Sequence, residues 1–185
     1  MGNILGINMD TDVFIMYFFF KCGAKQMTFL TEEEYVKGLR YFKCNTLSEV
    51  RNKITGVRES LLDIHSEDFR QFYDYLFDIN NPCSEQEKSK KTLDLEIVEV
   101  YFNALFCNQF AFVKEFLQYL KEKNVGLIWD EYDYLLDFLK EKGANFPNDY
   151  QLYDVYPLIL DNFYKWYCNK HGIKIPEPKK EDDLF

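Results

Sequence analysis

Apolar side chains recur at helical spacing along most of the chain. The clearest pattern lies towards the C-terminus, where two apolar stripes follow the i, i+3, i+4 rule of an amphipathic helix. The first stripe is Ile128, Tyr132, Leu135, Leu136 and Leu139, and the second is Leu152, Tyr156, Ile159, Phe163 and Trp166. Residues 143–149 separate them and contain a glycine and the run Pro-Asn-Asp, which ends helices and forms turns. The pattern predicts a helix over 127–140 and another over 154–169, with Asp154 as N-cap because Pro157 then falls in the first turn.

The first part of the chain also predicts helices. Residues 12–21 are almost wholly apolar, which indicates a helix buried on most of its circumference. Thr31 and Thr46 are each followed three residues later by glutamate, the capping-box pattern that begins a helix. After Thr46, an apolar stripe over 47–64 predicts one long amphipathic helix.

The middle of the chain contains the predicted boundary between two subdomains. Ser66 is expected to cap a helix that ends near Asn80. Residues 83–91 are polar and charged without periodicity, so we predict a loop that joins the two subdomains. Beyond the loop, apolar stripes over 97–105 and 113–120 predict an antiparallel pair of helices.

The predicted fold class is all-α, because no strand pattern of any length occurs. We expect a domain over 1–172, made of a degenerate EF-hand-like first subdomain over about 9–82 and a helical bundle over about 92–170. Residues 173–185 contain two prolines and mixed charges, so we expect a mobile tail there.

Composition narrows the range of partners. The 185 residues include 31 acidic and 22 basic side chains, which give a formal charge of −9. This charge would repel a phosphate backbone, so we expect no nucleic-acid partner. Aromatic residues make up 18% of the chain, more than a disordered protein could keep in water. The chain is therefore folded, and we expect a monomer.

Cysteine usage and hydropathy indicate an intracellular protein. The five cysteines form no CxxC pair and the chain has only two histidines, so we expect reduced cysteines and no zinc site. The most apolar window, residues 13–20, is too short to span a bilayer and lacks the flanks of a secretory signal. Gly2 could suggest myristoylation, but Gly6 stands where that motif needs Ser or Thr. We expect a cytoplasmic or nuclear protein without a membrane span.

Candidate catalytic and metal-binding residues are few. Cys107 would be the nucleophile of a thiol-dependent transferase if His65 or His171 supplied a base; alternatively, it is a small buried side chain at a helix end. Asp10 and Asp12 begin a calcium-loop pattern that nothing continues, which leaves a calcium-responsive EF-hand-like protein as a further alternative. We expect no catalytic residue, no cofactor and no bound metal.

Acidic side chains border both C-terminal apolar stripes. Asp130 lies at the start of the first predicted helix, and Asp154 and Asp161 lie seven residues apart, on one face of the second. Carboxylates beside exposed apolar side chains suit a basic protein partner. We therefore expect the protein to act by surface recognition.

Several motifs in the second half resemble those of one family. They are LDLE at 93–96, YFN at 101–103, FAF at 110–112, WDEY at 129–132, LLDF at 135–138 and YPLILDNF at 156–163. In order and interval they are similar to the potentiating-neddylation domain, which defines the defective-in-cullin-neddylation proteins. The resemblance runs from about Val13 to Tyr167. It implies a scaffold-type ligase that binds the cullin C-terminal winged-helix region and the N-terminally acetylated neddylation conjugating enzyme together, so that catalysis arises from proximity and orientation.

The resemblance implies a cullin-binding patch at Asp130, Val155 and Asp161. The family has Asp, Ala and Asp at these positions, so Val155 adds bulk at the centre of the patch. The alternative is that Asp130 only caps its helix and Asp161 only faces water. The sequence leaves both interpretations open.

The resemblance also implies an apolar pocket for the acetylated N-terminal methionine of the conjugating enzyme. Acetylation removes the amine charge, so burial no longer requires desolvation of an ion. The positions that match the pocket walls are Ile15, Phe18, Phe19, Cys22, Leu30, Ile79, Tyr101, Ala104 and Leu105. Each of them is also a plausible core residue, and that alternative stays open.

Overall fold

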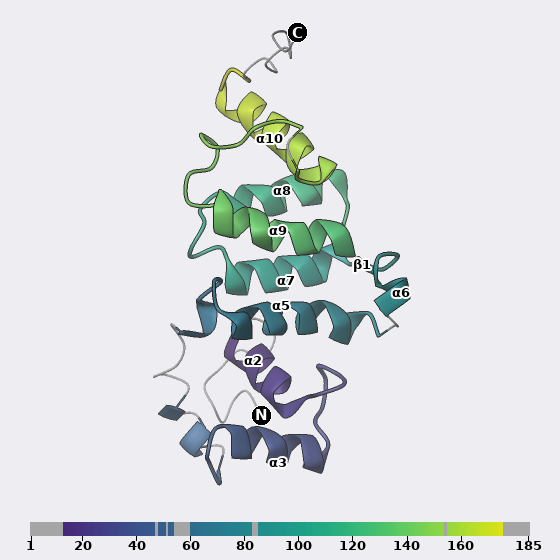
Figure 1. The fold of residues 1–185 in the computed structure, drawn as a ribbon, viewed down its shortest axis with the longest axis vertical. Helices are drawn as coiled ribbons and strands as arrows, with labels where there is room; N and C mark the ends of the chain where they lie inside the picture. The colour runs from purple at the N-terminus through teal and green to yellow at the C-terminus, as the bar shows by residue number, and fades with distance from the viewer. Residues whose placement is uncertain are drawn as a thin grey trace, which may run out of the picture.

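Helices stacked along one long axis make up this computed structural model (Figure 1). The structure describes residues 13–46, 48–50, 52–53, 60–82, 85–153 and 155–175. The described helices are α2 (Val13–Cys22), α3 (Glu32–Tyr41), α5 (Glu67–Asn80), α6 (Glu85–Lys88), α7 (Leu95–Leu105), α8 (Val113–Lys123), α9 (Trp129–Glu141) and α10 (Leu158–His171). The predicted all-α class is confirmed. None of the helices in the described ranges is long and apolar enough to cross a membrane.

Helix α2 is the centre of the first half. Every side chain from Val13 to Phe19 is buried, as the sequence predicts. The capping box before α3 is confirmed, because Thr31 Oγ1 accepts from the Glu34 N–H and Glu34 Oε2 accepts from the Thr31 N–H. The cap of α5 is confirmed too, since Ser66 Oγ accepts from the N–H of Phe69 at 3.1 Å.

The helix predicted over 47–64 is wrong at its C-terminal end. Thr46 Oγ1 accepts from the Glu49 N–H at 3.3 Å, so the start signal is formed. However, Ser60–Leu62 form a single 3-10 turn, η1. Ile64 lies in the turn that follows and is buried in the hydrophobic core, although it belongs to no helix. Residues 47, 51 and 54–59 lie outside the described part.

Two predicted boundaries in the second half also need correction. The segment 83–91 is not only a loop, because it contains the one-turn helix α6. The last helix begins at Leu158 with Pro157 at its N-cap position, four residues after the predicted start. Asp154 lies outside the described residues, so its predicted role as a cap stays a prediction. Asp161 itself lies in the first turn of α10.

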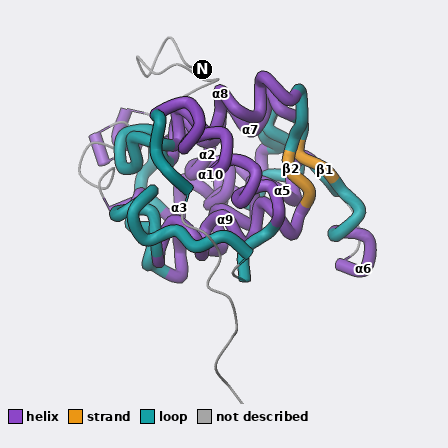
Figure 2. Tube along the Cα trace, turned by 90° about the horizontal axis from the view of Figure 1, so that it is seen from above, coloured by secondary structure: helices purple, strands orange, loops and turns teal. Residues whose placement is uncertain are grey.

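The structure also contains a strand pair that the sequence did not predict. Strands β1 (Thr92–Leu93) and β2 (Leu127–Ile128) pair antiparallel, and they lie at one side of the stack, next to α6 (Figure 2). The paired residues are too few to show an alternating pattern. The pair joins the segment before α7 to the start of α9.

A pair of tyrosines connects α5 of the first half to α9 of the second. The rings of Tyr73 and Tyr132 stack with centroids 4.0 Å apart and planes 5° apart. The Tyr73 hydroxyl donates to the Tyr132 carbonyl at 2.7 Å, and the Tyr132 hydroxyl donates to the Tyr73 carbonyl at 2.9 Å. Burial raises the pKa of both phenols well above the ordinary value of 10.0. The two halves are thus joined by a reciprocal, buried contact.

We expect Tyr73→Phe and Tyr132→Phe to make stability less sensitive to alkaline pH. A raised native pKa means that the native state keeps a proton that the unfolded chain releases, so the stabilisation is complete below about pH 10 and falls above it by about 1.4 kcal/mol per pH unit for each group. Each variant should therefore lose less unfolding free energy per pH unit, by the contribution of the one tyrosine that it lacks. Urea unfolding between pH 9 and about pH 11 measures it. The control Phe69→Leu should lower stability without changing the slope, and equal slopes in all variants would contradict the prediction.

Candidate functional site

The strand pair fixes the start of α9, where the first candidate residue lies. Thr92 pairs with Ile128 and Leu93 pairs with Leu127. Gly126 precedes the pair, and a Cβ at this position would overlap the carbonyl oxygen of Leu93. Glycine is therefore required by the close approach of the two backbones. The N–H of Trp129 then donates to the Lys91 carbonyl at 3.3 Å, which extends the attachment into the helix.

Asp130, the second residue of α9, is exposed. It makes no hydrogen bond or ion pair with any residue that the structure describes. The helix is capped instead by Glu131, whose Oε2 accepts from the N–H of Ile128 at 3.1 Å and whose pKa is raised by burial. Asp130 gains at most the favourable interaction of a first-turn carboxylate with the helix dipole. Its charge is therefore available to a partner.

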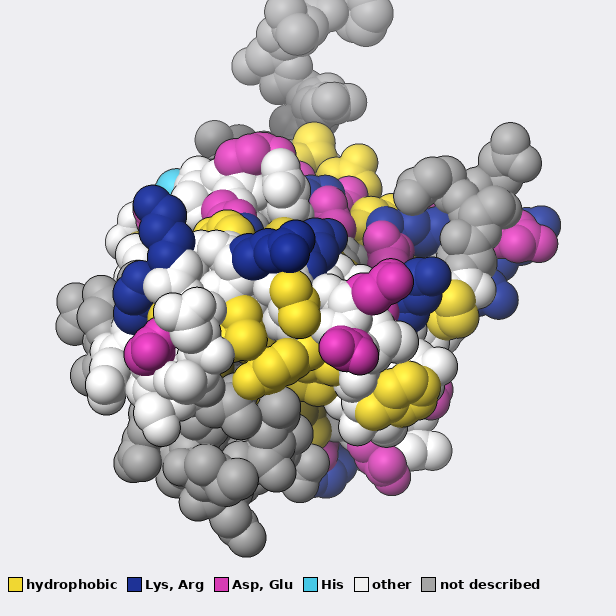
Figure 3. Space-filling model, turned by 90° about the horizontal axis from the view of Figure 1, so that it is seen from below, with side chains coloured by type: hydrophobic (Ala, Val, Ile, Leu, Met, Phe, Trp, Pro, Cys, Tyr) yellow, Lys and Arg dark blue, Asp and Glu magenta, His cyan; other side chains and the backbone are white. Residues whose placement is uncertain are grey.

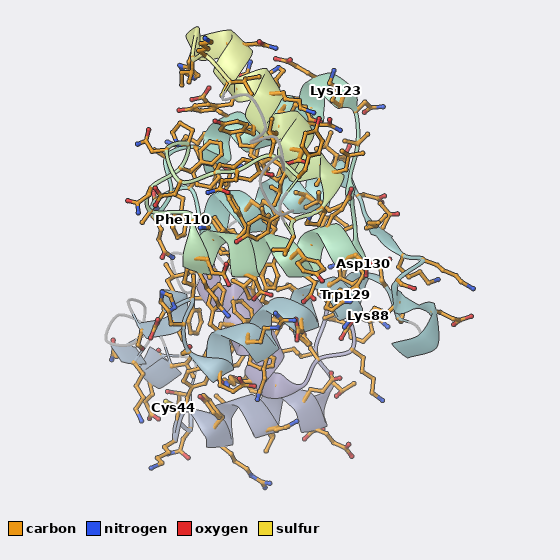
Figure 4. The ribbon with its side chains drawn as sticks, turned by 45° about the horizontal axis from the view of Figure 1, so that its top comes forward. Cys44, Lys88, Phe110, Lys123, Trp129 and Asp130 are labelled. Carbon is orange, nitrogen blue, oxygen red and sulfur yellow. The ribbon has the colours of Figure 1, made fainter. Side chains whose placement is uncertain are left out.

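A cation–π contact supports the same helix start. Lys88 of α6 is buried, and its Nζ lies 3.6 Å from the ring centroid of Trp129 and 2.7 Å from a carboxylate oxygen of Asp78. Figure 4 shows Lys88 and Trp129 side by side, with Asp130 next to them. Because Lys88 is held by both α5 and α9, it fastens α6 to the base of the site.

Asp161 does not lie on the surface. The residue is 4% exposed, and its Oδ1 accepts from the Tyr150 hydroxyl at 2.8 Å. Its two carboxylate oxygens lie 3.3 and 3.2 Å from the backbone nitrogen of Tyr153. The side chain thus holds the segment before α10, so the interpretation that it only faces water is wrong. The predicted direct contact with a cullin stays a prediction.

Exposed apolar side chains lie around the start of α10. Val155 is 73% exposed and Leu158 is 64% exposed. Leu158 lines a cleft of about 920 Å³ together with Ile128, which is 39% exposed. The cleft therefore continues from α10 to the residue two positions before Asp130. Leu158 and the start of α9, which carries Asp130, therefore border one cleft, and Val155 lies three residues before Leu158 in the sequence.

The residues proposed for the methionine pocket divide into two groups. Six are at most 4% exposed, namely Ile15, Phe18, Phe19, Cys22, Tyr101 and Leu105. Leu30, Ile79 and Ala104 are partly exposed, and Leu30 and Ala104 pack against the core. The elements that carry them converge, because the Tyr75 hydroxyl of α5 donates to the Ala24 carbonyl at 3.1 Å and Asn80 Nδ2 donates to the Tyr101 hydroxyl at 2.7 Å. The six buried side chains fit the alternative that these positions belong to the hydrophobic core.

The end of the molecule formed by α3 also presents apolar side chains. Figure 3 shows hydrophobic groups between charged ones on this face. Phe29 is 54% exposed and Tyr41 is 50% exposed. A cleft of about 600 Å³ there includes Cys22, Gly23 and Thr31 in its lining. Of the nine proposed pocket residues, Cys22 is the one that lines it.

The geometry gives little support to catalysis or metal binding. The Cys107 thiol is 9% exposed and donates to Asn103 Oδ1 at 3.3 Å, and burial raises its pKa. A thiol with a raised pKa is a poor nucleophile at neutral pH. Within the described ranges, no group of three His, Cys, Asp or Glu side chains is placed to hold a metal. Asp10 and Asp12 lie outside those ranges.

Residues 49–166 match the sequence model of a protein family described as Cullin binding. The match covers more than half of the chain. This chain belongs to the cullin-binding family. The matched residues include α9, the segment after it and the part of α10 up to residue 166, so they contain Asp130, Val155 and Asp161. The resemblance to the potentiating-neddylation domain is confirmed.

Curated relatives carry the same resemblance. DCN1-like protein 5 of Bos taurus is 26% identical over 157 residues, which are 84% of this chain and 63% of the relative. The Homo sapiens DCN1-like protein 5 is 26% identical over 156 residues, 84% of this chain and 62% of the relative. DCN1-like protein 4 of Homo sapiens is 26% identical over 160 residues, 86% of this chain and 52% of the relative. This member of the cullin-binding family thus spans between half and two thirds of their length.

We expect Gly126→Ala to destabilise this protein by about 1–3 kcal/mol, because the added methyl must displace the backbone of the paired strand. Gly172→Ala is the matched control: the backbone there has φ +64, but a Cβ would meet nothing within 4 Å. That control should cost about 1 kcal/mol for the backbone conformation alone. Urea midpoints measure both. A smaller loss for Gly126→Ala than for Gly172→Ala would contradict the close approach of the strands.

Proposed function

We propose that this protein is a non-catalytic scaffold for cullin neddylation, which binds a cullin C-terminal winged-helix region and the N-terminally acetylated conjugating enzyme together. It acts as a monomer in the cytoplasm or nucleus. Its contribution to rate is proximity and orientation, since bringing two reactants into one complex removes much of the entropic barrier. The observation that carries the proposal is that Asp130 is exposed and pairs with no described residue, close in sequence to the cleft lined by Ile128 and Leu158, in a chain that belongs to the cullin-binding family.

The charge of the molecule supports a basic partner at this surface. A net charge of −9 attracts a positively charged protein over several ångströms and speeds encounter. Asp130 makes no ion pair with a described residue, so binding would not have to break one. Val155 and Leu158, at the start of α10, are largely exposed and offer apolar area that a partner can cover.

We predict that Asp130→Lys weakens binding of a purified cullin C-terminal domain by about tenfold or more at low salt, because a favourable charge contact becomes a repulsive one. The difference should shrink as salt is raised, since exposed charges are screened. Binding is measured by isothermal titration calorimetry, and unfolding midpoints establish that the variant is folded.

Glu33→Lys is the matched control for this substitution. Glu33 is also exposed and also the second residue of a helix, α3, which lies at the end of the molecule away from α10 (Figure 1). This change has the same effect on net charge and should leave cullin binding within about twofold. Equal loss in both variants would mean that net charge alone attracts the partner. No loss in Asp130→Lys would remove Asp130 from the site.

The proposed second contact is with the acetylated methionine of the conjugating enzyme. Six of the nine pocket positions are buried in the described structure, so access would begin at the partly exposed Leu30, Ile79 and Ala104. These positions come from the segment before α3, from α5 and from α7. The buried side chains would have to rearrange to admit a methionine.

We predict that an acetyl-methionine peptide of the conjugating enzyme binds more tightly than its unacetylated form, because burying a charged amine is costly. Ala104→Trp should fill the entrance and abolish the difference. Glu96→Trp, at an exposed position of the same helix, should preserve it. Titration with a fluorescent peptide measures each affinity. Equal or absent binding of both peptides to the unmodified protein would refute this half of the proposal and leave the cullin contact standing.

A further inference from the structure

The segment before α10 displays one aromatic side chain in an unusual way. Tyr153 is 66% exposed, and its backbone has φ +63, a left-handed conformation that costs a residue with a side chain about 1 kcal/mol or more. At this exposure the ring buries little of its apolar area. Such a conformation persists only where surrounding contacts enforce it.

Two residues of α10, one turn apart, supply those contacts. The buried carboxylate of Asp161 accepts from the Tyr153 N–H at 3.2 Å. Lys165 donates from Nζ to the Tyr153 hydroxyl at 3.1 Å, and the same ammonium lies 4.8 Å from the ring centroid. The backbone and the side chain of Tyr153 are therefore held by separate contacts, which restrict the ring before any partner arrives.

Tyr153 continues the exposed apolar surface of the candidate site. Val155 follows it by two residues at 73% exposure and Leu158 by five at 64%. A rigid aromatic beside aliphatic side chains loses little conformational entropy on binding, which is why tyrosine is frequent among residues that dominate interface energies. We call Tyr153, Val155 and Leu158 the apolar ridge.

We infer that the apolar ridge enters an apolar depression on the cullin domain, with Tyr153 as its anchor, and that Asp161 is a positioning residue that acts through Tyr153. The inference rests on the proposed function for the identity of the partner. The ridge lies inside the segment that matches the cullin-binding family and is continuous, through Leu158 and the cleft that it shares with Ile128, with the start of α9. Asp130 would then supply the charge and Tyr153 the apolar contact.

The first experiment separates the ring from the backbone of Tyr153. Tyr153→Asn removes the ring while retaining a residue that tolerates positive φ, so the loop should keep its conformation. We expect it to weaken binding of the cullin C-terminal domain by about tenfold to a hundredfold, mainly through faster dissociation. Tyr153→Phe keeps the ring and should bind within about threefold of the unmodified protein.

Tyr41→Asn is the matched control, because Tyr41 is a similarly exposed tyrosine in the first half, 50% accessible. It should leave cullin binding within about twofold. Surface plasmon resonance gives the rates for all variants. If Tyr153→Asn binds as tightly as the unmodified protein, Tyr153 is not an anchor. If Tyr41→Asn weakens binding equally, the effect does not belong to the ridge.

The second experiment asks how Asp161 acts. Asp161→Asn keeps an oxygen that can accept from both the Tyr150 hydroxyl and the Tyr153 N–H, but it removes the charge. We expect Asp161→Asn to bind within about threefold of the unmodified protein, and Asp161→Ala to lose about tenfold. In the Tyr153→Asn background, Asp161→Ala should cause no further loss, because the two residues act as one unit.

The outcomes distinguish this inference from the proposed function. If the unmodified protein does not bind a cullin, the proposed function fails. If it binds and Asp161→Asn loses as much affinity as Asp161→Ala, the charge of Asp161 acts on the partner directly and the positioning role is refuted. Additive losses in the double variant would refute it as well. Near-ultraviolet circular dichroism establishes that each variant retains its tertiary structure; if Asp161→Ala does not, the inference is tested by Tyr153→Asn against Tyr153→Phe.

Discussion

The reciprocal contact between Tyr73 and Tyr132 is the interaction on which the arrangement of the two halves depends. Each hydroxyl donates to the main chain of the opposite helix, so α5 and α9 cannot slide or rotate against each other without losing both bonds. The stacked rings exclude water from those bonds and strengthen them. The base of α9 also contacts α5, because Trp129 packs edge-on against Phe77 with centroids 4.9 Å apart. Any partner held by one half is therefore held at a fixed orientation to the other.

The candidate surface depends on short segments that are held against these helices by specific contacts. The strand pair and Lys88 determine where α9 begins, and Asp161 determines the path of the chain before α10. In this way the exposed Asp130 and the apolar ridge are displayed by a rigid frame, which reduces the entropy lost on binding. Two carboxylates that look equivalent in the sequence thus have different roles. Asp130 is exposed and pairs with no residue in the described part of the chain, whereas Asp161 is buried and bonded to Tyr150 and Tyr153.

Much of the fold could be predicted from local signals. The capping residues Thr31 and Ser66 act within one turn of their own helices, so sequence spacing alone locates the helix starts. The same holds for the apolar stripe of α2, which is buried as expected. The failures occur where a distant segment decides the outcome. Neither the two-residue strands nor Lys88 under Trp129 can be recognised without knowing what lies beside them, and Ile64 is buried outside any helix.

By itself, the sequence determined the all-α class, the positions of most helices and the motifs that place the chain in the cullin-binding family, because periodicity, caps and motif spacing are written along the chain. Only the tertiary structure decided which candidate side chains are exposed. It left Asp130 and Val155 on the surface, buried Asp161, and enclosed most of the proposed pocket residues. The physical reason is that exposure depends on every segment that packs over a residue, and those segments come from distant parts of the chain.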